Sequence, residues 1–128
     1  MTCDPHYELS VQEHFAAAHH LRGYDGECAR PHGHNWTVEV FVTFSMLNDI
    51  GIGIDFRDVK AALRDTLSDL DHTDLNELQE FAQQNPSSEN IARYVYHALK
   101  DRLDSPGLQF SKVTVSEASG CAVTYSEG

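Results

Sequence analysis

The alternation of apolar and polar side chains predicts two strands near the start of the chain. Residues 7–13, YELSVQE, alternate between the two kinds, and residues 35–44, NWTVEVFVTF, do so again. A period of two residues is typical of half-buried strands. The segment between them, 16–34, is rich in Gly, Ala and His, and we interpret it as a strand end followed by a loop.

Beyond Gly51 and Gly53 the apolar spacing changes to that of a helix. Positions three and four apart carry Phe56, Val59, Leu63, Leu67 and Leu70. Asp55 is a suitable N-cap for this helix. A second helix is predicted to begin at NPSSEN, where Ser87 or Ser88 can cap it.

The end of the chain returns to strands, at 110–117 and 121–126. The order is therefore ββααββ, which predicts an α+β fold: a four-stranded antiparallel sheet with both helices on one face. The other face would carry Phe41 between Thr37 and Thr43. Such a partly apolar face favours burial in an oligomer.

Length and charge narrow the class of protein. At 128 residues we expect a single domain, 1–128, and 41% hydrophobic residues suit a globular chain. No apolar run approaches the roughly 20 residues of a membrane span, and the start lacks the features of a signal peptide, so we expect a cytoplasmic protein. The net charge of −11 argues against a nucleic-acid partner. The three cysteines show no CxxC spacing and are expected to be reduced thiols.

Eight histidines are the composition's main indication of chemistry. His32 and His34 share parity, so on an extended backbone both imidazoles point the same way, about 7 Å apart along the chain. That geometry can grip one zinc ion, although two surface histidines could share this spacing by chance. His19 or His20 is the best third ligand, because a neighbouring strand would bring it beside them. Three histidines without a fourth protein ligand are typical of an open, catalytic zinc site.

Three further residues are candidates for catalysis. Cys28 lies in a polar loop beside the proposed metal, which would lower the pKa of its thiol; a lone cysteine is otherwise an inert small hydrophobe. Asp71 and His72 close the first helix, either as a proton relay or because a histidine suits a helix C-terminus. Glu117 keeps the parity of Val113 and Val115, and could anchor an amino-bearing ring or stand at the rim of the sheet.

A cupin-type metalloenzyme is an alternative. Gly26, His32, His34 and Glu39 match most of the first cupin signature, but Met46 stands where the closing glycine belongs. The predicted helices also occupy the part of the chain in which a cupin would continue its strands.

Six ordered motifs resemble those of the 6-pyruvoyl-tetrahydropterin synthase family, over almost the whole chain. They are FAAAHHL (15–21), CARPHGH (28–34), IDF (54–56), LDH with LN (70–76), NPSSENIA (85–92) and Glu117. The first motif makes His19 the metal ligand in place of His20. The Cys-x3-HGH spacing is similar to that of the 6-carboxy-5,6,7,8-tetrahydropterin synthase branch, which serves queuosine biosynthesis.

The resemblance implies a T-fold, in which three subunits close their sheets into a barrel and two trimers stack as a homohexamer. It implies zinc held by His19, His32 and His34, and catalysis by Cys28, Asp71, His72 and Glu117. Glu117, Ser88 and Asp55 would contact the substrate, 7,8-dihydroneopterin triphosphate. The implied products are 6-carboxytetrahydropterin, acetaldehyde and triphosphate; the pyruvoyl branch instead eliminates triphosphate from the same substrate.

Overall fold

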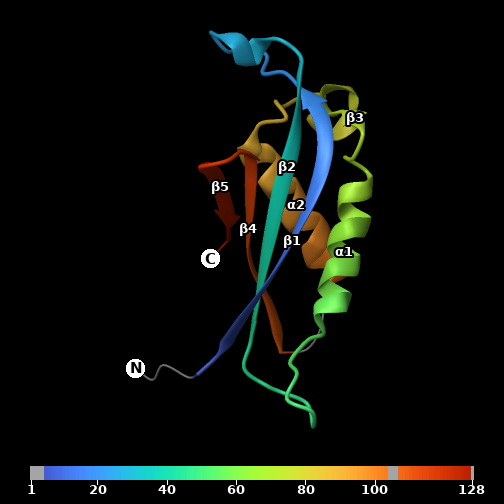
Figure 1. Ribbon diagram of the computed structural model, residues 1–128, viewed down its shortest axis with the longest axis vertical. Coiled ribbons are helices and arrows are strands. Elements are labelled where there is room, and N and C mark those ends of the chain that lie inside the picture. Colours follow the sequence, from blue (N-terminus) through green and yellow to red (C-terminus); the bar gives the residue numbers. More distant parts are fainter. Residues whose placement is uncertain (1–4, 104–106, 128) are drawn as a thin grey trace.

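The computed structural model describes residues 5–103 and 107–127 (Figure 1). In chain order the elements are β1 (Tyr7–His19), the 3-10 turn η1 (Glu27–Ala29), β2 (His32–Phe44), α1 (Phe56–Ser68), β3 (Thr73–Asp74), the 3-10 turns η2 (Leu75–Glu77) and η3 (Gln79–Phe81), α2 (Ser88–Arg102), β4 (Leu108–Ala118) and β5 (Cys121–Ser126). The predicted order ββααββ is confirmed, with a short strand added between the helices.

The strands form one sheet in the order β3-β1-β2-β4-β5. The four long strands pair antiparallel, as predicted. The predicted number of strands is corrected from four to five, because β3 pairs in parallel with β1 through Thr73 and Asp74. The sheet is therefore mixed. A strand of two residues is too short to show apolar alternation, so the sequence pattern could not predict it. It is a strand only through its pairing with β1.

Both strands next to the first loop are longer than their alternation indicates. β1 continues to His19 and β2 already begins at His32, and these two residues are paired directly. The interpretation of 16–34 as a strand end followed by a loop holds, with the strand reaching His19 and the loop confined to residues 20–31. Alanines and histidines carry little hydrophobic signal, so here the pairing of the two strands with each other extends them.

The two helices cover the same face of the sheet, as the sequence predicts (Figure 1). α1 packs on β1, and α2 packs on β4 and β5. The sheet's fully buried side chains all lie on this face, among them Trp36, Val38, Val40, Val42, Val113 and Val115. Burial of each large apolar side chain stabilises the fold by about 1.5–3 kcal/mol. The helices between β2 and β4 show that the cupin interpretation is wrong.

Both predicted helix starts are confirmed. The Asp55 carboxylate accepts a hydrogen bond from the backbone N–H of Arg57 at 2.8 Å and caps α1. For α2 the structure selects Ser87 over Ser88, because Ser87 Oγ accepts from the N–H of Asn90 at 3.2 Å.

The end of α1 differs from the prediction. The helix stops at Ser68, so Asp71 and His72 lie beyond it, although the backbone N–H of Asp71 still donates to the carbonyl of Leu67 in the last turn at 2.9 Å. His72 has a φ of 60°, in the left-handed region that few non-glycine residues adopt. Its backbone N–H donates to the carbonyl of Ala16 at 2.5 Å. The interpretation of His72 as a partner of the helix dipole is therefore wrong.

Candidate metal centre

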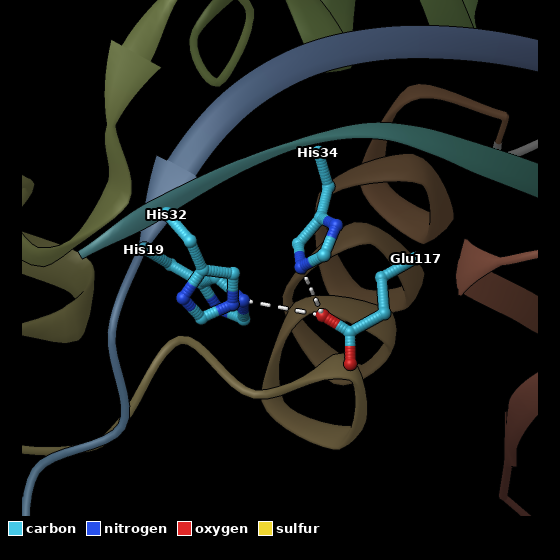
Figure 2. Close-up of side chains that lie close together, drawn as sticks. All are labelled: His19, His32, His34 and Glu117. Carbon is cyan, nitrogen blue, oxygen red and sulfur yellow. Dashed lines mark ion pairs between the residues drawn. The ribbon is translucent and has the colours of Figure 1, made fainter. Parts of the chain in front are cut away.

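Three histidines and one glutamate meet where β1 ends and β2 begins (Figure 2). The β1–β2 register sets His19 opposite His32 and Ala17 opposite His34. On the other side of β2, Thr37 is paired with Ser116, which brings Glu117 next to this end of the strand. One ligand atom from each of His19, His32, His34 and Glu117 lies within 4.8 Å of the others.

Backbone carbonyls fix the tautomers of two of these histidines. Nδ1 of His19 lies 2.7 Å from the carbonyl oxygen of Pro86, and Nδ1 of His32 lies 2.6 Å from that of Arg30. A carbonyl oxygen only accepts, so each Nδ1 must carry the proton. In a neutral imidazole this leaves the Nε2 lone pair free, which is the arrangement found in metal-bound histidines.

His19 is the most deeply buried member, with 2% of its side chain exposed. Its ring stands edge-on to that of Trp36, with centroids 4.8 Å apart. Burial lowers the pKa of His19 below its usual range, although the Pro86 carbonyl and the Glu117 carboxylate act to raise it. The imidazole is therefore neutral near pH 7, as metal binding requires.

Glu117 points into the cluster from β4. Its Oε2 lies 3.2 Å from Nε2 of His19 and 3.1 Å from Nε2 of His34 (Figure 2). Oε2 and the buried Nε2 of His19 nevertheless make no hydrogen bond. The pairing of β4 with β5 shifts by one residue between Val115 and Ala118. Such bulges often re-aim a side chain beside a functional site.

This donor set fits a zinc ion. Zinc with ligands at about 2.0–2.1 Å in a tetrahedron has neighbouring donor atoms roughly 3.3 Å apart. The two contacts of Glu117 Oε2 have nearly this length. A bound cation would also satisfy the buried Nε2 of His19, which is otherwise left without a partner. The sequence-based set of three histidines is thus brought together, and the Glu117 carboxylate points into the same group. In the sequence, the position of Glu117 two residues after inward-facing Val115 was the indication that its side chain also points inward.

Asp71 and His72 form a second, adjacent arrangement. Oδ2 of Asp71 lies 2.9 Å from Nδ1 of His72, and Oδ1 accepts from the N–H of Ala16 at 2.9 Å. The hydrogen bond from Ala16, followed by those from His72, lowers the pKa of Asp71. The carboxylate therefore stays ionised near neutral pH and orients an exposed imidazole. His72 and His34 both line a shallow pocket of about 400 Å³.

The other predicted residues lie apart from this cluster within one chain. Cys28 is half-buried in η1, in the loop between β1 and β2, and is outside the four-residue group. Ser88 occupies the first turn of α2. Asp55 caps α1 and pairs with Arg57 at 2.9 Å, at the end of the molecule opposite to the cluster (Figure 1). None of these three lines the pocket that holds His34 and His72.

The fold and the cluster together define a class: a T-fold protein with a histidine and glutamate group that can hold a metal ion. Its solved neighbours include 6-pyruvoyl tetrahydropterin synthase of Caenorhabditis elegans, with a TM-score of 0.84, 25% sequence identity and complete coverage of both chains. The family described as 6-pyruvoyl tetrahydropterin synthase matches residues 8–128. The chain belongs to this family.

Relatives in the carboxy branch are also similar to this chain. The 6-carboxy-5,6,7,8-tetrahydropterin synthase of Bacillus subtilis is 33% identical over 104 residues, which cover 77% of this chain and 69% of the relative. The protein of the same name from Synechocystis is 34% identical over 116 residues, covering 87% and 86%. These matches confirm the resemblance seen in the motifs.

Proposed function

We propose that this chain is a zinc-dependent 6-carboxy-5,6,7,8-tetrahydropterin synthase of queuosine biosynthesis. It would convert 7,8-dihydroneopterin triphosphate and water to 6-carboxytetrahydropterin, acetaldehyde and triphosphate. The observation that supports this most is the pair of carbonyl-fixed histidines, which leaves two Nε2 lone pairs for one metal ion. The names of the relatives and the Cys-x3-HGH spacing favour the carboxy branch.

The proposed roles follow from the chemistry of each side chain. Zinc would be held by His19, His32 and His34, and as a Lewis acid it would acidify the hydroxyls of the substrate side chain. Glu117 would turn its carboxylate from the histidines to the pterin, and accept hydrogen bonds from the ring's amino group and N–H. Ser88 and Asp55 would be further substrate contacts; for Asp55 this requires a second subunit, given its distance from the cluster.

Proton transfer would use two groups. As a thiolate, Cys28 would remove a proton from the substrate side chain, with Glu27 as the next candidate for this base. His72, oriented by Asp71, would carry protons on the opposite side. The side chain is oxidised while the ring is reduced by the same two electrons, so no external redox cofactor is needed. Water supplies the second carboxyl oxygen when the carbon–carbon bond breaks.

No helix in the described part of the chain is long and apolar enough to cross a bilayer. We place the reaction in the cytoplasm, where thiols such as Cys28 and Cys121 stay reduced.

The decisive experiment is to incubate zinc-loaded protein with 7,8-dihydroneopterin triphosphate and identify the pterin by mass. Acetaldehyde is measured in parallel through its reduction by NADH and alcohol dehydrogenase. We expect equal amounts of acetaldehyde, triphosphate and the carboxylated pterin. Triphosphate without acetaldehyde would identify a pyruvoyl-type synthase, the activity named for the solved neighbour. Neither product from zinc-loaded protein would overturn the proposal.

A further inference from the structure

The edge of β1 is bonded in a regular way that continues past the end of the strand. Ala16 uses both backbone groups there: its N–H donates to Asp71 and its carbonyl accepts from His72. Next along the edge, β3 pairs with Ala17 and Ala18. Within the described residues β3 ends at Asp74. The backbone N–H and carbonyl groups farther along this edge are nevertheless hydrogen-bonded as well.

Two asparagine side chains take over where β3 ends. Oδ1 of Asn76 accepts from the N–H of His20 at 2.8 Å, and its Nδ2 donates to the carbonyl of His20 at 3.1 Å. Two residues further on, Oδ1 of Asn85 accepts from the N–H of Arg22 at 2.9 Å, and its Nδ2 donates to the Arg22 carbonyl at 3.0 Å. A carboxamide offers the same donor and acceptor as a peptide group. Each asparagine side chain therefore pairs with one backbone residue as a residue of a neighbouring strand would.

The two paired residues follow closely after His19, the buried member of the cluster. His20 and Arg22 are held on the same edge, so the backbone that follows His19 is fixed at two alternate positions. The imidazole is held by the same segment, because the carbonyl that accepts from His19 belongs to Pro86, the neighbour of Asn85. Asn85 is in turn held by Asn90, whose Nδ2 donates to its carbonyl at 2.8 Å.

The side chain of Arg22 makes further hydrogen bonds to the segment that contains Asn85. Its Nη2 donates to the carbonyl of Phe81 at 2.5 Å and to that of Gln84 at 2.7 Å, and its Nε donates to Oδ1 of Asn85 at 3.2 Å. The loop between η3 and α2 is thus bonded at several points to the segment that follows β1. Movement of this loop would displace the Pro86 carbonyl and with it the proton on Nδ1 of His19.

We propose that Asn76 and Asn85 are positioning residues of the metal centre. Their carboxamides fix the backbone after His19, and Asn85 also fixes the carbonyl that selects the His19 tautomer. This inference rests on the proposed function, since it concerns the same zinc site. Groups that orient a metal ligand without touching the metal themselves typically contribute 10- to 100-fold to metal affinity.

Zinc affinity of the full-length protein, measured by competition with a chromophoric chelator, tests the proposal. We expect Asn76→Ala and Asn85→Ala to bind zinc at least about tenfold more weakly than wild type. Asn48→Ala is the matched control. Its Oδ1 also accepts from two backbone N–H groups, those of Ile50 and Ile52, but in the loop at the opposite end of the molecule (Figure 1). Asn48→Ala should keep wild-type affinity.

A second readout separates positioning from loss of fold. The ¹⁵N shifts of the His19 ring in metal-free protein report which nitrogen is protonated, and we expect Asn85→Ala to lose the pure Nδ1–H form. Should an alanine variant not fold, Asn85→Asp retains the acceptor for the Arg22 N–H but sets a charged oxygen against the Arg22 carbonyl, and is expected to show a loss of the same kind. Wild-type zinc affinity and tautomer in folded Asn76 and Asn85 variants would overturn the inference. Failure of wild type itself to bind zinc would overturn the proposed function, while the ring shifts would still test the positioning.

Discussion

Two backbone carbonyls, those of Pro86 and Arg30, decide which nitrogen of His19 and of His32 is free to bind a metal ion. Neither carbonyl belongs to a residue with metal chemistry of its own. The site is therefore defined by the donor atoms together with the bonds that hold their protons in place. His34, more exposed at 27%, and Glu117, at 33%, form the side of the cluster that faces solvent.

Removal of single ligands should abolish metal binding. We expect His32→Ala and His34→Ala to lose nearly all zinc in metal analysis, because the two histidines that remain bind zinc much more weakly than three do. His14→Ala is the control, since this exposed histidine bonds Thr37 and lies outside the cluster. Full zinc occupancy in both cluster variants would contradict the assignment.

Removal of the proposed base should affect turnover and leave the metal in place. Cys28→Ala is expected to retain zinc and bind pterin, yet to turn over at least roughly a hundredfold more slowly. Glu117→Ala should instead mainly lose pterin binding, seen as a rise in KM or in the Kd of a pterin product. A near-wild-type kcat for Cys28→Ala would make the cysteine a bystander and direct attention to Glu27.

Among the elements, α2 links stability to the site, since its first turn follows directly on Pro86. Ser87 caps the helix through the Asn90 N–H, and its backbone carbonyl accepts from Ile91 at 2.9 Å. The same short segment therefore starts a helix and holds the ring of His19. Packing of α2 on β4 and β5 completes the support of this end of the sheet.

The cap can be tested by chemical denaturation. Ser87→Ala is expected to lower the free energy of unfolding by about 1 kcal/mol, because the Asn90 N–H loses its acceptor. Ser88→Ala is matched in chemistry, but the Ser88 hydroxyl makes no hydrogen bond within the described residues, so its stability should be unchanged. Equal stability of all three proteins would show that the cap contributes nothing. A raised KM confined to Ser88→Ala would support its proposed contact with substrate.

For the molecule as a whole, the outer face of the sheet and the spread of the proposed site favour assembly. Phe41 is half-buried there, with the Lys112 ammonium 4.7 Å from the centre of its ring. Asp55 lies at the end of the molecule opposite to the cluster, and Cys28 lies outside the cluster. A site completed by neighbouring subunits would account for both features.

We therefore expect a homohexamer, or at least a trimer, in solution. Light scattering at micromolar concentration measures the mass directly. Phe41→Glu places a carboxylate on the outer face and should shift the protein toward monomer, whereas Ala61→Glu on the exposed side of α1 reports the general effect of added charge. A stable wild-type monomer would contradict the prediction.

The sequence by itself determined the elements and much of the donor set. Alternation set the faces of β2 and β4, and with them the common direction of His32 and His34 and the parity of Glu117. Helical spacing and capping residues located both helix starts. These features are local, because a period of two or of 3.6 residues and a cap depend on neighbours in the chain.

Only the tertiary structure decided how distant segments meet. The FAAAHHL motif favours His19 over His20, but only the pairing of His19 with His32 places it in the cluster. Likewise, β3 exists because Thr73 and Asp74 lie against β1, and the approach of Glu117 to His19 depends on the register of three strands. The carbonyl of Pro86, 67 residues from His19, fixes its tautomer. Hydrogen bonds across such separations form only when packing closes the chain between them, so no local pattern encodes them.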